Sequence, residues 1–177
     1  MKLVVINGSP RKQGRTGMVS RFISNAYGVE FIDLSALILP LFNGGETQAK
    51  LMSVRVLREA VEEADGIILA SPEYHSGMSG ALKNALDFLS CQHFQHKPVA
   101  LIAVAGGGKG GINALNNMRV VARGLYANVI PKQVVLDPIC FTENGELTAE
   151  AGKLVDDVLM ELKLYVHAHQ SIKQLNS

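Results

Sequence analysis

The chain has 177 residues, of which 47% are hydrophobic and 19% charged, a composition typical of a folded globular domain and not of a disordered segment. Lys and Arg number 17 and Asp and Glu 16, so the formal net charge is +1 and no global field favours nucleic acid. The longest apolar run, residues 99–105, is too short to span a bilayer. We therefore expect neither nucleic acid nor a membrane as a partner. Cys91 and Cys140 lack the spacing of metal ligands, so we expect no metal site. Two cysteines also suit a reducing compartment, and we therefore expect the protein in the cytoplasm.

Short apolar runs alternate with amphipathic stretches along the chain. The first run, from Leu3 to Ile6, is typical of a strand buried on both faces. Thr16 is predicted to cap the following helix and Gly28 to end it, and Thr47 is predicted to cap the next helix. The predicted strands cover residues 3–6, 29–34, 66–70, 99–105 and 134–136, and the predicted helices cover residues 16–27, 47–64, 79–89, 112–126 and a last helix that begins at 148.

Five strand–helix units in strict alternation predict an α/β fold, with a parallel sheet and helices on both faces. Right-handed crossovers leave few arrangements, and for five strands we expect the flavodoxin-like, doubly wound order 2-1-3-4-5. No linker or repeat divides the chain, so residues 1–177 are expected to form a single three-layer domain. Ligands in such folds bind beyond the carboxyl ends of the strands. The loops 7–16, 71–79 and 105–111 are therefore expected to form the site.

The first of these loops has the composition of an anion site. It contains Arg11, Lys12 and Arg15, two hydroxyl groups and no acidic residue, and it directly precedes a helix. Free backbone N–H groups and the helix dipole favour an anion there, and phosphate suits the position best. The loop lacks the Gly-Lys-Ser/Thr ending of a nucleoside triphosphate site, so a monophosphate cofactor fits better. A basic turn that only contacts solvent remains the alternative.

The loop 71–79 is suited to the wall of a flat ring, and the loop 105–111 to close approach of backbone to a ligand. Pro72 and Tyr74 can contact such a ring, while His75 is a candidate acid–base group for which no carboxylate partner other than Glu73 is evident. The loop 105–111 matches Gly-x-Gly-x-x-Gly, but it follows the fourth predicted strand, whereas the dinucleotide fingerprint follows the first. We interpret this loop as backbone that lies close to a ligand, with free N–H donors and with Lys109 at the rim.

Three motifs together resemble a known family. They are Asn7-Gly8-Ser9-Pro10-Arg11 with Thr16, then Pro72-Glu73-Tyr74-His75-Ser76-Gly77, then Leu82-Lys83-Asn84-Ala85-Leu86-Asp87. The motifs resemble those of the NADPH-dependent FMN reductases of flavodoxin-like fold, and among these the bacterial azobenzene reductases, which also reduce quinones. The resemblance covers nearly the whole chain, about residues 1–165.

The resemblance implies a non-covalently bound FMN. Its phosphate would be held by Ser9, Arg11, Arg15 and Thr16. Its ring would lie against Pro72, Glu73, Tyr74, His75, Ser76 and Gly77, with Gly106, Gly107 and Gly108 near its polar edge. Many members carry Asn where this chain has His75. The family also implies a homodimer or homotetramer, and the surplus apolar residues of 112–126 and 37–42 independently suggest a subunit contact.

These observations predict an FMN-dependent oxidoreductase, with NADPH as cosubstrate. Hydride would pass from NADPH (or NADH) to FMN, and two electrons would then pass to azo compounds or quinones by a ping-pong mechanism. Because the flavin carries the chemistry, no catalytic side chain is expected. The amides of 106–108, with Lys109, are candidates to stabilise the reduced flavin. The alternative is a flavodoxin-type electron carrier without its own turnover, although such carriers are usually strongly acidic. A scaffold protein without a cofactor is a third hypothesis, which the intact loops disfavour.

Overall fold

A parallel sheet forms the centre of the molecule in the computed structural model, which describes residues 1–108 and 110–175. Its strands are β1 (Leu3–Asn7), β2 (Glu30–Asp33), β3 (Gly66–Tyr74), β5 (Pro98–Val104) and β6 (Asn128–Leu136), in the order β2-β1-β3-β5-β6. The short strand β4 (Gly77–Met78) pairs antiparallel with β3. The five predicted strands correspond to β1, β2, β3, β5 and β6, so the predicted order 2-1-3-4-5 is confirmed.

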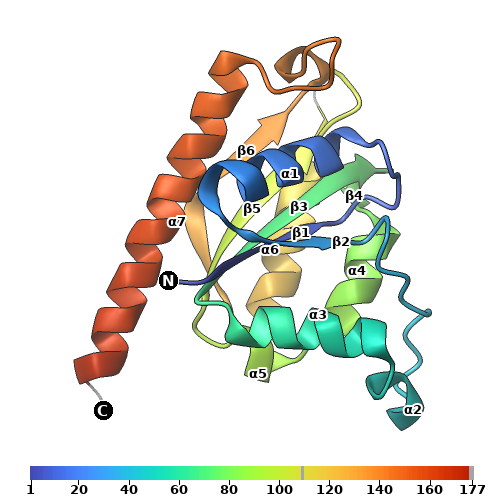
Figure 1. Cartoon of the computed structure of the whole chain (residues 1–177), viewed down its shortest axis with the longest axis vertical. Helices are drawn as coiled ribbons and strands as arrows, with labels where there is room; N and C mark the ends of the chain where they lie inside the picture. The colour runs from blue at the N-terminus through green and yellow to red at the C-terminus, as the bar shows by residue number, and fades with distance from the viewer. Residues whose placement is uncertain (109, 176–177) are drawn as a thin grey trace.

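Helices cover both faces of this sheet (Figure 1). The helices are α1 (Arg15–Tyr27), α2 (Glu46–Ala49), α3 (Met52–Glu63), α4 (Gly80–Asp87), α5 (Cys91–Phe94), α6 (Ile112–Gly124) and α7 (Ala149–Leu175). A 3₁₀ turn, Pro138–Cys140, follows β6. Apolar residues of α1 and α7 pack on one face, and those of α3, α4 and α6 pack on the other. The predicted three-layer architecture is therefore confirmed.

The alternation of side chains along β1 explains why both faces are apolar. Val4 and Ile6 belong to the core under α3 and α4, while Leu3 and Val5 belong to the core under α1 and α7. All five residues of β1 and all seven of β5 are buried. A continuous apolar run is therefore what a central strand of this sheet requires.

Of the three helix starts predicted at a threonine, two are wrong and one is right. Gly14, in an extended conformation, is the N-cap of α1, so Thr16 lies inside the helix. Thr47 lies within α2, and the long helix expected from it is broken between Ala49 and Met52. The last helix begins as predicted, because the Thr148 hydroxyl accepts a hydrogen bond from the Ala151 N–H at 3.2 Å.

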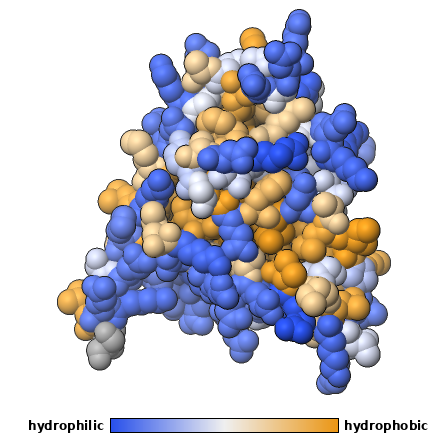
Figure 2. All heavy atoms as spheres, in the orientation of Figure 1, coloured by the Kyte–Doolittle hydropathy of each residue, from blue (hydrophilic) through white to orange (hydrophobic). Residues whose placement is uncertain are grey.

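Several large apolar side chains remain at the surface of this chain (Figure 2). On the segment between β2 and α2, Ile38 is 85% and Leu41 83% exposed, and on α6 Val120 is 60% exposed. Within the described residues, no helix has the length and apolar character needed to cross a membrane. These exposed residues belong to two segments that the sequence associates with a subunit contact.

Candidate functional site

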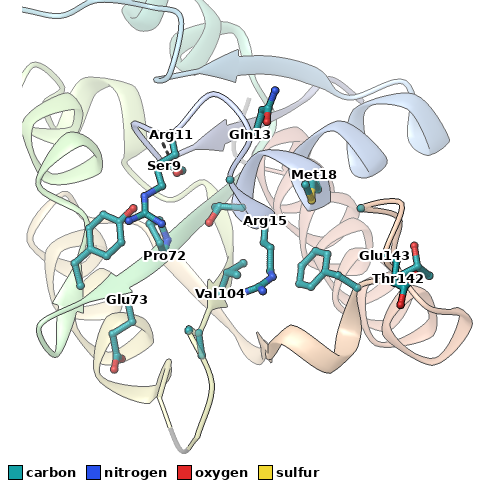
Figure 3. Close-up of a pocket in the computed structure, with 17 residues that line it drawn as sticks. Ser9, Arg11, Gln13, Arg15, Met18, Pro72, Glu73, Val104, Thr142 and Glu143 are labelled. Carbon is teal, nitrogen blue, oxygen red and sulfur yellow. Dashed lines mark hydrogen bonds between the residues drawn. The ribbon is translucent and has the colours of Figure 1, made fainter.

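A cavity of about 560 Å³ opens at the carboxyl ends of β1, β3 and β5 (Figure 3). This is the position that a doubly wound sheet gives to its ligand site, and the volume falls in the range of small-molecule sites. The lining residues are Ser9, Arg11, Gln13, Gly14, Arg15, Thr16, Met18, Pro72, Glu73, Tyr74, Val104, Ala105, Gly106, Phe141, Thr142, Glu143 and Gly145. The cavity therefore joins parts of all three predicted loops with a fourth segment.

The loop after β1 is held rigidly by buried groups. The Asn7 side chain donates to Asp33 Oδ1 at 2.7 Å and accepts from the Ser9 N–H at 3.1 Å. The Gly8 N–H donates to the Ala70 carbonyl at 2.7 Å, and a Cβ at Gly8 would lie only 2.7 Å from that oxygen. Only glycine therefore allows this approach of β1 to β3.

The same loop presents donors without acceptors. Gly14 caps α1 without a side chain that could bond the first N–H groups of the helix. Within the described part of the chain, Arg11, Lys12 and Arg15 form no ion pair. The guanidinium group of Arg11 lies 5.8 Å from the centre of the Tyr74 ring. The arrangement of free N–H groups, the positive end of a helix and unpaired cations is that of an anion site.

The second predicted loop is largely an extension of β3 that turns back into β4. Glu73 pairs with Met78 and Tyr74 with Gly77, so His75 and Ser76 form the two-residue turn. Both have positive φ, 48° and 64°, as a type I′ hairpin turn requires. Pro72, Glu73 and Tyr74 line the cavity, while the exposed His75 and Ser76 and the half-buried Gly77 are not among its lining residues.

Ser79, which the sequence did not single out, connects this hairpin to the loop 7–16 by hydrogen bonds. Its hydroxyl donates to the Gly8 carbonyl and accepts from the Leu82 N–H at 3.0 Å, which makes it the N-cap of α4. Its own N–H donates to Ser71 Oγ at 2.9 Å. A Ser immediately before an amphipathic helix is a recognisable capping signal, and here it also fixes the distance between two walls of the cavity.

The glycine loop contributes the third wall through Val104, Ala105 and Gly106. Gly107 and Gly108 have φ values of 127° and 73°, and neither is among the lining residues. Positive φ explains the glycines at these two positions. Lys109, predicted at the rim, lies outside the described residues.

The fourth wall was not predicted. Phe141, Thr142, Glu143 and Gly145 line the cavity from a turn that follows β6. In this turn the Thr142 N–H donates to the Glu146 carbonyl at 2.8 Å, and Phe141 forms an antiparallel bridge with Leu147. The dipeptide Asn144-Gly145 is a signal for such a turn, but its position beside α1 depends on tertiary contacts.

Comparison with known proteins now identifies the class of this fold and site. A sequence profile described as NADPH-dependent FMN reductase matches residues 1–139. The chain is 55% identical over 174 residues to "NADPH azoreductase" of Bacillus sp. (strain OY1-2), covering 98% of this chain and 97% of the relative. It is 28% identical over 189 residues to "FMN-dependent NADPH-azoreductase" of Staphylococcus aureus (strain USA300), covering 100% and 96%.

Solved structures show the same fold. FerB, described as a flavoenzyme NAD(P)H:(acceptor) oxidoreductase from Paracoccus denitrificans, superposes with a TM-score of 0.73 at 22% identity, covering 96% of this chain and 97% of that one. General stress protein 14 from Treponema denticola, solved in complex with FMN, superposes with a TM-score of 0.61 at 17% identity, covering 93% and 99%. The fold is therefore that of the flavodoxin-like flavoproteins.

The chain belongs to the NADPH-dependent FMN reductase family. It is an oxidoreductase of the azoreductase type, with FMN as cofactor and NADPH as electron donor. The resemblance inferred from the three sequence motifs is confirmed.

Proposed function

We propose that this enzyme takes a hydride from NADPH, or NADH, and delivers two electrons to azo compounds or quinones. The observation that carries this proposal is the cavity lined by Arg11 and Arg15 at the N-terminus of α1, where neither arginine forms an ion pair within the described structure. The name of the 55% identical relative, NADPH azoreductase, supports azo compounds as the class of acceptor.

The residues of the cavity fit FMN. A phosphate monoester requires cations and N–H donors, and we propose that Ser9, Arg11, Arg15 and Thr16 hold it. Ser9 is 1% and Thr16 2% exposed, so their positions are fixed, while both arginines are exposed and can reach a ligand. The loop 7–16 contains no carboxylate, and neither arginine forms an ion pair within the described residues, which supports this assignment.

We assign the flavin ring to the walls that follow β3 and β5. We propose that it lies against Pro72, Glu73 and Tyr74 and beside the turn formed by His75, Ser76 and Gly77, with Gly106, Gly107 and Gly108 at its polar edge. When bound, FMN supplies hydride acceptance and two-electron donation. The chain's own groups orient the ring, and the glycine-loop amides are proposed to stabilise the negative charge that reduction adds.

The absorption spectrum of the purified protein tests the cofactor. We expect a yellow protein that releases FMN, not FAD, on denaturation, since the loop after β1 suits one monophosphate. Under anaerobic conditions NADPH should bleach the colour, and an azo dye or a quinone should restore it. A protein that binds FMN but oxidises neither NADPH nor NADH would favour the alternative, a flavodoxin-type electron carrier. A protein that does not take up FMN would contradict both.

We propose a ping-pong order of reaction, in which donor and acceptor use the open cavity beside the glycine loop in turn. Initial rates at several concentrations of NADPH and of azo dye, or of a quinone, should give parallel double-reciprocal lines. Intersecting lines would show that both substrates are bound together and would contradict the proposed order.

We also propose that the protein is a homodimer or homotetramer in the cytoplasm. The exposed side chains of Ile38, Leu41 and Val120 support a subunit contact. Free thiols at Cys91 and Cys140 are compatible with a reducing compartment. Light scattering at micromolar concentration should give at least twice the chain mass of 19.1 kDa, and a monomer would contradict the proposed assembly.

A further inference from the structure

Helix α6 begins beside the flavin cavity without a cap of its own. Its N-cap is Gly111, which has a φ of 98° and no side chain to bond the first N–H groups. A Cβ at Gly111 would lie 2.4 Å from Val135 Cγ1, so no larger residue fits there. The first turn also contains no acidic residue. The start of α6 therefore needs an acceptor from elsewhere in the chain.

Glu73 supplies that acceptor from β3. Its Oε2 accepts a hydrogen bond from the Ala114 N–H at 2.9 Å. Ala114 is the third residue of α6 and is fully buried, so with Glu73 in place its N–H depends on this bond and not on water. An N-cap side chain normally bonds the N–H at this third position. Glu73 thus acts as a cap that is distant in sequence, and Figure 3 shows its carboxylate directed away from Arg11.

Asn117 makes a second connection in the opposite direction. Its Oδ1, on α6, accepts from the Met78 N–H at 3.3 Å, and Met78 is the residue paired with Glu73 across the β3–β4 hairpin. The hairpin and α6 are therefore joined by two side chains, one from each element. The two walls proposed to contact the flavin ring are held together at this point.

The glycine loop between β5 and α6 depends on these anchors. At one end the Ala105 N–H donates to the Leu136 carbonyl at 3.0 Å, and at the other end Glu73 holds Ala114. A Cβ placed on Gly110 would lie 3.5 Å from Glu73 Oε1, so the carboxylate also packs close to the loop itself. Glycines carry no side chains that could fix the path of such a loop.

We propose that Glu73 is a positioning residue that sets the place of the amides of Gly106, Gly107 and Gly108 at the flavin ring. The proposal rests on the function proposed above, in which those amides stabilise the charge of the reduced ring. We attribute this positioning to the place of the Glu73 carboxylate oxygen and not to its negative charge, because the hydrogen bond to the Ala114 N–H is the contact that fixes α6. A displacement of about 1 Å at a reacting centre can cost about a hundredfold in rate.

Two substitutions separate geometry from charge. Glu73→Gln keeps an oxygen acceptor at the same reach and removes the charge, whereas Glu73→Asp keeps the charge and withdraws the acceptor by one methylene. The matched control is Glu161→Asp, because Glu161 Oε1 also accepts from a backbone N–H, that of Lys132, at 2.9 Å and is not among the residues of the cavity.

The first measurement uses the protein without FMN. Hydrogen exchange at the Ala114 amide should be at least about tenfold faster in Glu73→Asp than in the parent, and within about threefold in Glu73→Gln and Glu161→Asp, because opening of the helix start exposes this amide. Unchanged protection in Glu73→Asp would overturn the proposal.

The second measurement uses the FMN-loaded enzyme. The rates are compared at saturating FMN, because Glu73 is proposed to lie against the flavin ring and its variants can change FMN affinity. Glu161→Asp, outside the cavity, should keep the parental dissociation constant for FMN. The rate of flavin reduction by NADPH should fall about ten- to hundredfold in Glu73→Asp, and the fall in Glu73→Gln should be at least about fivefold smaller. An equal or larger loss in Glu73→Gln would overturn the proposal, since charge would then matter more than geometry.

If Glu73→Asp does not fold, Asn117→Ala and Glu73→Gln decide in its place. Asn117→Ala removes the second connection and should slow flavin reduction by at least about tenfold at unchanged FMN affinity, and by more than Glu73→Gln does. Parental rates in Asn117→Ala would overturn the proposal. A parent protein that does not bind FMN would instead contradict the proposed function, and the exchange measurement would still decide the role of Glu73 in holding α6.

Discussion

Replacement of Arg11 by Ala should weaken FMN binding while leaving the fold intact. The backbone N–H of Arg11 donates to Ser9 Oγ at 3.2 Å, and this bond does not depend on the side chain. The guanidinium contacts the Tyr74 ring and forms no ion pair within the described residues, so its removal leaves no carboxylate without a partner. One hydrogen bond to a charged group contributes about 1.5–3 kcal/mol, which corresponds to a loss of about 10- to 150-fold in affinity.

Lys12→Ala is the control that separates a direct bond from the general effect of charge. It removes the same charge one residue away, but Lys12 is not among the residues that line the cavity. At 0.15 M ionic strength the Debye length is about 8 Å, so an exposed charge without direct contact should change affinity by less than about threefold. Titration of apoprotein into FMN, followed by flavin fluorescence, measures the FMN affinity of both variants. Parental affinity in Arg11→Ala, or an equal loss in Lys12→Ala, would refute the assignment of Arg11 to the phosphate.

Three further substitutions test other parts of the structure. His75→Asn should leave turnover within about tenfold, because His75 is exposed in the turn and general acid–base catalysis would contribute about 10²–10⁴-fold; a larger loss with FMN still bound would make His75 catalytic. Gly111→Ala should lower the free energy of unfolding by about 2–4 kcal/mol in urea titrations, because φ is positive there and the added Cβ would clash with Val135. Gly124→Ala is the control. It should be neutral or stabilising, because nothing lies within 4 Å of the added Cβ. Burial lowers the pKa of His93 from 6.5, so below pH 6.5 the unfolded state binds more protons than the folded state. The free energy of unfolding should therefore fall as the pH drops through 6.5. His93→Gln should reduce the slope of this fall, and an unchanged slope would contradict the prediction.

The sequence predicts the central strands of this fold well because their signal is local. The continuous apolar runs of β1 and β5 can arise only where both faces of a strand are covered. The carboxyl-terminal half of β3 was missed, since Ser71 and Pro72 do not extend an apolar pattern. These residues become strand because they pair with Ala103 and Val104 of β5. Pairing between segments about thirty residues apart overrides the local preference.

The location of the candidate site could be predicted because it depends on the order of the strands in the sheet. The rule that ligands bind beyond the carboxyl ends of parallel strands selected the loops after β1, β3 and β5. The turn around Gly145 was missed because β6 lies at the edge of the sheet, away from β1. It reaches the cavity by packing on α1, where a Cβ at Gly145 would lie 3.0 Å from Met18 Cε. No local sequence pattern can indicate a tertiary contact between residues so far apart in the chain.

The loop 7–16 carries charges that stability alone would not select. Cations near the N-terminus of a helix are unfavourable by about 0.3–1 kcal/mol each, because the helix dipole is positive there. Arg11 and Arg15 nevertheless line the start of α1, and no carboxylate of the loop offsets them. A bound dianionic phosphate would relieve both the dipole and the mutual repulsion of the cations. The loop is therefore less favourable when empty than a neutral one would be. If the phosphate of FMN binds here, as proposed, that difference adds to its affinity.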